Sequence, residues 1–115
     1  TTGISDYFIE IRNRGLLYRF SLQYSDEHRN ELSSLTTPGE FLTTLRKQNV
    51  LQKFISFAAS EGVKGSGSDI RISGQLLEVQ LYAYISRNFI DNRGFYPILQ
   101  EIDKTLLTAI EEFEN

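Results

Sequence analysis

Apolar residues recur at every third or fourth position along most of the chain, and this spacing predicts amphipathic helices. The clearest row has a spacing of four residues and consists of Leu77, Leu81, Ile85 and Phe89. Strict alternation of apolar and polar residues, which is typical of strands, is scarce, and residues 70–72 are its best example. The pattern therefore predicts an all-α fold, a compact bundle of about six helices.

Short polar residues and glycines mark the ends of the first helices. Ser5 is placed to cap a short helix that ends about residue 13, and Gly15 follows as a terminator. We expect a second helix from residue 16 to about residue 32. Thr37 opens the clearest start signal, because a proline occupies the first helical position and a glutamate completes a capping box.

The helix that begins at Thr37 is expected to end near residue 49, and another to start about residue 50. Residues 62–69 are rich in glycine and serine and predict a flexible loop. Ser73 is the expected cap of the long helix that carries the leucine row. After it, residues 91–94 predict a turn, followed by a short helix and by a last helix capped by Asp103.

Composition describes one ordinary globular domain, residues 1–115, with 40% hydrophobic and 23% charged residues. Net charge is −3, so the chain has no basic footprint for nucleic acid. Cysteine is absent, which excludes disulfides and cysteine-ligated metal. No apolar run is long enough for a membrane span.

Three side chains invite a catalytic or metal-binding interpretation. Ser60 follows small residues, as nucleophilic serines do, and Lys64 is close in sequence. We favour an ordinary helix-end serine, because a lysine in a flexible loop is not held as a base. His28 is the only histidine, and without a second histidine or a cysteine we expect no metal. No cofactor is expected, and Asp69 is interpreted as a turn residue.

The charges are unevenly distributed. Residues 101–115 hold five acids against Lys104, whereas residues 42–71 hold five basic residues against two acids. Two solvated helix faces are the favoured explanation, and electrostatic complementarity with a neighbouring domain is the alternative. For Arg87 we favour a structural role at a helix end, such as pairing with Asp91, over recognition of a carboxylate.

Aromatic residues gather near the end of the long helix and the turn that follows. We predict a contact surface there, made by Tyr82, Tyr84, Phe95 and Tyr96. Tyr82 and Tyr84 lie about 200° apart on a helix, so one small core cannot easily shelter both. Tyrosine suits interfaces because its ring is apolar while its hydroxyl remains hydrated.

Several segments carry a resemblance to a known family. They are residues 1–5, 15–20, 24–29, 85–89 and 92–97, together with the leucine-rich terminal helix. In these the chain resembles the C-terminal helical domain of a carboxyl-terminal processing serine protease. Proteases of this family carry a PDZ domain and use a Ser-Lys dyad.

The resemblance implies that residues 1–115 are a non-catalytic fragment of a periplasmic or cell-envelope Ser-Lys endopeptidase. Its expected work is to pack on the catalytic or PDZ domain of the same protein, or to mediate self-association as a homodimer. The alternative is an independent helical adaptor that binds a peptide or a partner helix in a groove.

Overall fold

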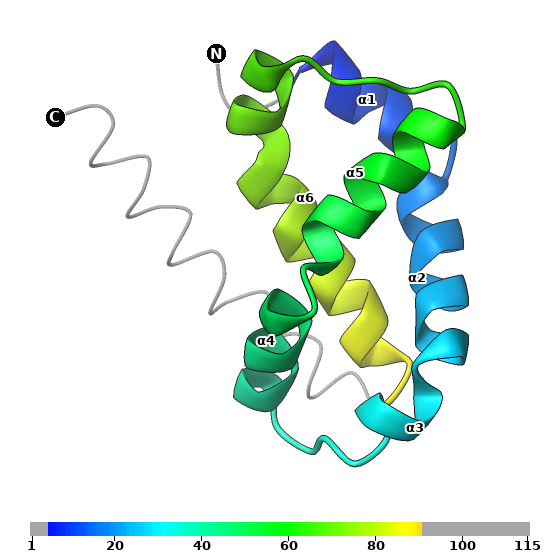
Figure 1. Ribbon diagram of the computed structural model, residues 1–115, viewed down its shortest axis with the longest axis vertical. Coiled ribbons are helices and arrows are strands. Elements are labelled where there is room, and N and C mark those ends of the chain that lie inside the picture. The colour runs from blue at the N-terminus through cyan, green and yellow to red at the C-terminus, as the bar shows by residue number, and fades with distance from the viewer. Residues whose placement is uncertain (1–4, 91–115) are drawn as a thin grey trace, which may run out of the picture.

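The computed structural model describes residues 5–90, and all its regular structure in that range is helical. The helices are α1 (Asp6–Asn13), α2 (Leu16–Glu27), α3 (Arg29–Leu32), α4 (Pro38–Lys47), α5 (Val50–Ser60) and α6 (Gly67–Arg87) (Figure 1). The predicted compact all-α bundle of about six helices is confirmed. Residues 70–72, the best strand candidate, lie in α6.

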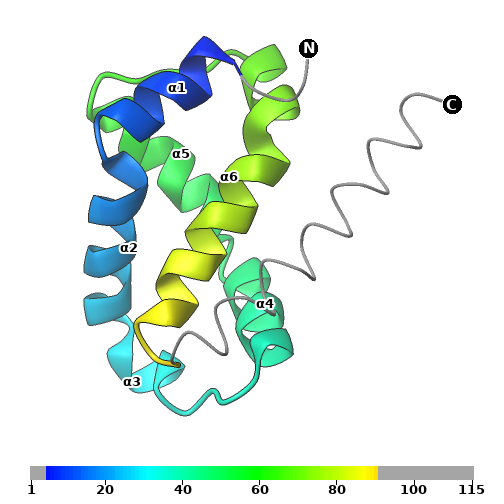
Figure 2. The same ribbon diagram turned by 180° about the vertical axis from the view of Figure 1, so that it is seen from behind.

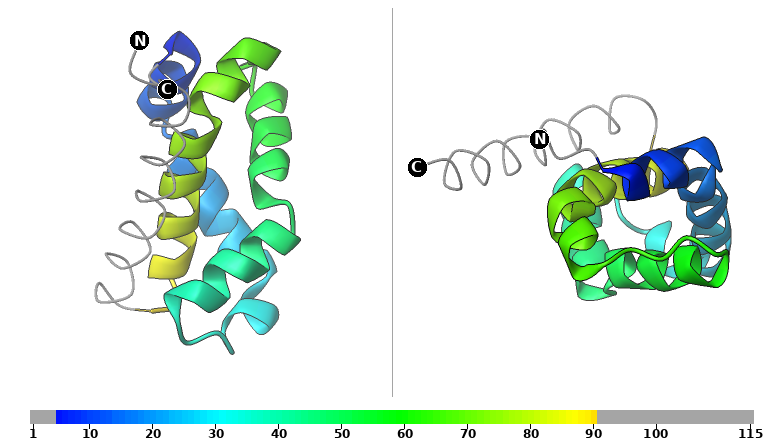
Figure 3. Two further views of the ribbon diagram at one scale, coloured as in Figure 1. Left: turned by 90° about the vertical axis from the view of Figure 1, so that its left-hand side faces the viewer. Right: turned by 90° about the horizontal axis from the view of Figure 1, so that it is seen from above.

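The longest helix, α6, is the centre of the bundle, because it contacts α1, α2, α4 and α5. Viewed from behind, α6 runs diagonally along the near side, with α1 and α2 to one side and α4 to the other (Figure 2). Helix α5 lies on the opposite side of the bundle, as the view from above shows (Figure 3). Each of these helices therefore buries part of its surface against α6.

The inner side of α6 supplies the middle of the core. Leu77, Leu81 and Ile85 are each 0% exposed, as the leucine row predicts, and Phe89 at the end of the row is partly buried. Large side chains from the other helices complete this core: Ile11, Leu16, Leu32, Phe41, Leu45, Val50 and Phe54.

Two predicted helix starts are confirmed in atomic detail. The Ser5 hydroxyl accepts a hydrogen bond from the Phe8 backbone N–H at 3.2 Å. Thr37 and Glu40 form the reciprocal capping box, with the Glu40 N–H donating to Thr37 Oγ1 at 3.2 Å. Such caps satisfy N–H groups that have no partner within their own helix.

Two short connections use left-handed backbone. Gly15 has a φ of 65° between α1 and α2, and Asn49 has a φ of 54° between α4 and α5. Asparagine tolerates this region better than most residues that carry a Cβ atom. The reversals after α1 and α4 are therefore specified by the residues at these two positions.

Two predicted boundaries were wrong. The helix expected from residue 16 to about residue 32 is interrupted at His28, which separates α2 from the single turn of α3. The long helix begins at Gly67, six residues before the expected cap Ser73. Ser66 caps it, and Asp69, interpreted as a turn residue, completes a second capping box with Ser66.

The loop between α5 and α6 is therefore shorter than the sequence suggested. The expected turn at residues 91–94, the short helix after it and the last helix capped by Asp103 lie outside the described residues.

Candidate functional site

An aromatic patch lies where α2 and α6 pack together. The ring of Tyr18 on α2 meets the ring of Tyr84 on α6 edge to face, with centroids 6.4 Å apart. Tyr18 is 59% exposed, and Leu22, one turn further along α2, is 41% exposed. Tyr84 is half-buried. We call Tyr18, Leu22 and Tyr84 the aromatic patch.

Tyr82 does not belong to this surface, which corrects the prediction that placed it there. Its side chain is only 2% exposed. Because one helical residue advances the direction by about 100°, Tyr82 points inward beside Leu81. Burial raises the pKa of the Tyr82 hydroxyl well above its usual value, and Glu78 adds to this effect. Phe95 and Tyr96, the other two predicted interface residues, lie outside the described residues.

The predicted contact surface did not include Tyr18 or Leu22, although both lie in the helix expected from residue 16 to about residue 32. The signal that could have found them is their spacing of four residues on α2, which places them on one face. That face is turned away from the buried Leu17 and Phe20.

Apart from the aromatic patch, a group of polar side chains surrounds Tyr24, which is 4% exposed. Its hydroxyl donates to Gln48 Oε1 on the segment after α4, and Gln48 Nε2 donates to Glu31 Oε2 at 2.9 Å. The His28 ring stacks on Tyr24, with centroids 3.9 Å apart. These contacts explain His28 as a half-buried packing residue. Among residues 5–90 no group of three or more histidine, cysteine, aspartate or glutamate side chains could hold a metal.

Burial raises the pKa of Tyr24 to about 12, and the carboxylates of Glu31 and Glu27 add to the shift. In the unfolded chain the pKa of the same hydroxyl is about 10. Between those two pH values the unfolded chain has lost the proton that the folded chain keeps, so stability falls as pH rises.

We therefore expect thermal melts to show a loss of up to about 2 kcal/mol between pH 10 and 12 that depends on Tyr24. Between pH 10 and 12 the stability of Tyr24→Phe should depend less on pH than that of the parent. At pH 8 the variant should be less stable than the parent, because it lacks the hydrogen bond from the Tyr24 hydroxyl to Gln48. Tyr18→Phe controls for the loss of an exposed tyrosine hydroxyl. If the free energy of unfolding fell equally steeply with pH in Tyr24→Phe and in the parent, the expectation would be contradicted.

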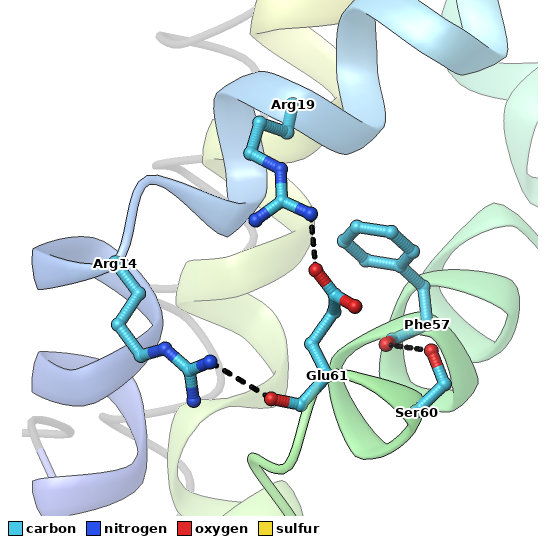
Figure 4. A network of polar contacts seen from close by, with 5 residues as sticks. All are labelled: Arg14, Arg19, Phe57, Ser60 and Glu61. Carbon is cyan, nitrogen blue, oxygen red and sulfur yellow. Dashed lines mark hydrogen bonds and ion pairs between the residues drawn. The ribbon is translucent and has the colours of Figure 1, made fainter.

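Ser60 and Lys64 were weighed as a nucleophile and its base. Ser60 is exposed at the last position of α5, and its hydroxyl donates to the Phe57 carbonyl of the preceding turn at 2.6 Å (Figure 4). Lys64 is exposed in the loop after α5. Ser60 thus has the back-bonded arrangement of an ordinary helix-end serine.

The residue after Ser60 closes the corner between α1, α2 and α5. Glu61 forms an ion pair through its carboxylate with Arg19 and accepts a bond from Arg14 Nη2 through its carbonyl at 2.9 Å (Figure 4). Arg19 also lies over the Phe57 ring, 5.7 Å from its centroid. Because these groups are substantially exposed, the ion pair itself contributes little, and the network serves mainly to fix geometry.

Part of the positive charge in residues 42–71 is paired with an acidic side chain inside the domain. Arg46 on α4 donates through Nε and Nη2 to Glu78 on α6, at 3.2 and 2.8 Å. Arg87 is exposed in the last turn of α6. Its proposed partner Asp91 and the acidic residues 101–115 lie outside the described residues.

Comparison with known proteins places the chain in a family. Residues 7–91 match DUF8443, a family of unknown function, so the chain belongs to that family. The match begins one residue into α1, covers the other helices of the described range, and ends just after α6. No curated protein and no solved structure matches the chain. Within residues 5–90, no helix has the length and apolar character needed to cross a membrane.

Proposed function

We propose that this member of the DUF8443 family is a non-catalytic helical domain that binds a neighbouring protein domain through the aromatic patch. The exposure of Tyr18 and Leu22 carries the proposal. They are two of the three large hydrophobic side chains that are exposed in residues 5–90, and the Tyr84 ring contacts that of Tyr18. Exposed apolar clusters of this kind mark contact sites, and tyrosine is favoured in them.

The partner proposed from the sequence resemblance is the catalytic or PDZ domain of a carboxyl-terminal processing Ser-Lys endopeptidase. In that case the domain works in the periplasm or cell envelope as part of the protease. The chemistry belongs to the parent protein, and we assign no catalytic role to Ser60. The partner surface would be apolar at its centre, with acceptors at its edge for the Tyr18 hydroxyl.

The test uses the natural full-length protein. Its reading frame should encode a Ser-Lys protease domain before residue 1 of this chain. Limited proteolysis should then cut the Tyr18→Ser and Leu22→Ser proteins near Gly3 at least several-fold faster than the parent, because the domain is less firmly docked. Gln52→Ser, a polar substitution at an exposed position of α5, is the matched control.

Two results would overturn this proposal. An unrelated domain, or none, before residue 1 would remove the protease assignment. Equal cutting rates for the patch variants and Gln52→Ser would remove the patch as the contact. A dimer detected by light scattering and lost in Tyr18→Ser would instead assign the patch to self-association.

The alternative is an independent adaptor that takes a peptide or partner helix. The confinement of the family match to the six-helix unit favours it, because that unit is then the part that recurs. Amphipathic helices bind such modules through anchors spaced by three or four residues. The full-length reading frame discriminates between the two proposals.

A further inference from the structure

A short connection between α5 and α6, which we call the strap (residues 62–66), crosses one end of the bundle. In the view from above, the strap and α1 lie along opposite edges of this end (Figure 3). Val63 is 2% exposed, and its N–H donates to a carbonyl of α5 at 2.9 Å. At the other end of the strap Ser66 caps α6. Between them Lys64 is exposed and Gly65 is half-buried. The strap is therefore anchored at two points, with a short segment between them.

Tyr7 on α1 reaches across this end of the bundle to the middle of the strap. A Cβ atom at Gly65 would lie 2.9 Å from Cε1 and Cζ of the Tyr7 ring and 3.0 Å from Cε2. These are the three ring atoms at the hydroxyl end of the side chain, so Gly65 lies against that end. Tyr7 is only 5% exposed, and the strap is part of what covers it.

The Tyr7 hydroxyl is buried without a hydrogen-bond partner, and within residues 5–90 it is the one side-chain N or O atom of which this is true. Burial raises the pKa of this hydroxyl, and the Asp69 carboxylate adds to the shift, so the group keeps both its proton and its acceptor lone pairs. A buried polar group that makes no hydrogen bond loses the interactions that water gave it in the unfolded chain. The closed position of the strap is therefore destabilised by the group that it covers.

We propose that the strap opens locally while the helices stay folded, and that hydration of the Tyr7 hydroxyl favours the open form. Lifting Gly65 off the ring admits water to the hydroxyl, which removes the cost of leaving it unpaired. Release of Val63 from the core opposes the opening, so the closed form remains the major one. Gly62, which has a φ of 91°, begins the strap and can absorb the change in backbone dihedral angles. The strap thus gives the domain a second form, reached by a local opening that requires less free energy than global unfolding.

Cutting of the folded 115-residue chain by a lysine-specific protease measures this opening. Lys64 lies in the strap, whereas Lys53 lies within α5 and is cut only when that helix unfolds. When opening and closing are fast, the rate of cutting follows the population of the open form. Cutting after Lys64, identified by peptide mass, should be at least several-fold faster than cutting after Lys53. It should also respond less to low concentrations of urea, because local opening exposes less surface than global unfolding.

Tyr7→Phe should slow cutting after Lys64 at least several-fold relative to the parent, because the closed strap no longer covers an unpaired hydroxyl. Tyr24→Phe is the matched control, since it removes a hydroxyl that is bonded to Gln48. This control should not slow cutting after Lys64. It should speed cutting after Lys53, because the domain as a whole is then less stable.

Gly65→Ala tests the same contact from the side of the strap. Its Cβ atom collides with the Tyr7 ring only in the closed form, so cutting after Lys64 should become faster. Gly67→Ala, with nothing within 4 Å of its Cβ atom, should leave the rate unchanged.

Two results would overturn the proposal. A Tyr7→Phe rate equal to or above that of the parent would show that the hydroxyl is already satisfied in the closed form. Equal dependence on urea for cutting after Lys64 and after Lys53 would show that both require global unfolding. None of the substituted residues lies in the aromatic patch, so the outcome is independent of the partner test.

Discussion

Leu81→Asp should leave the domain unfolded at room temperature. Leu81 is 0% exposed on the inner side of α6, the helix that contacts α1, α2, α4 and α5. An unpaired carboxylate in such surroundings costs several kcal/mol, which is comparable with the roughly 5–15 kcal/mol stability of a whole domain. Far-ultraviolet circular dichroism should show loss of most helix, without a cooperative melt.

The matched control introduces the same residue at an exposed position of the same helix. Gln75→Asp should keep its cooperative melt and lose no more than about 1 kcal/mol, because only helix propensity changes there. Glu78 is unsuitable as a control, since its carboxylate accepts two bonds from Arg46. A Leu81→Asp melt that overlays the parent curve would mean that the inner face of α6 is assigned to the wrong residues.

Gly65→Ala should destabilise the domain by about 1–3 kcal/mol, a large effect for a single methyl group. A Cβ atom at Gly65 would lie 2.9 Å from two carbons of the Tyr7 ring, closer than carbon atoms pack. Tyr7 is 5% exposed in the core, so its ring cannot move aside freely. Chemical denaturation should show a lower midpoint with an unchanged slope.

Gly67→Ala gives the contrasting result. Nothing lies within 4 Å of a Cβ atom there, and the residue starts α6, so alanine should be neutral or stabilising by up to about 1 kcal/mol. The cost of Gly65→Ala should also largely vanish in a Tyr7→Ala background, because the colliding ring is then absent. A Gly65→Ala cost that persists in that background would show that the ring contact is not its cause.

Local signals predicted those parts of the fold that local interactions determine. Ser5 and Thr37 cap the helices they were expected to cap, because each cap is completed within four residues. The leucine row likewise identified the inner side of α6, because its residues recur every four positions along one helix. The start of α6 was missed because glycine and serine at residues 65–68 outweighed a capping box between Ser66 and Asp69 that was present in the sequence.

The candidate site was less predictable, because it depends on how helices distant in sequence pack. Tyr82 and Tyr84 have the same side chain, and only the position of α6 in the bundle makes one buried and the other part of the surface. Tyr18 joins Tyr84 across 66 positions of sequence, a contact that no local pattern encodes. The surface therefore follows from tertiary structure rather than from helix periodicity.

The place of α6 in the chain has a consequence for synthesis on the ribosome. The helix on which α1, α2, α4 and α5 pack is the last of the described helices to be translated. Until it emerges, Phe8, Phe41 and Phe54 have no completed core to enter, although all three are buried in the native domain. Exposed apolar surface of this kind makes a nascent chain prone to aggregation. We therefore expect the first 66 residues to expose apolar surface until translation has passed α6.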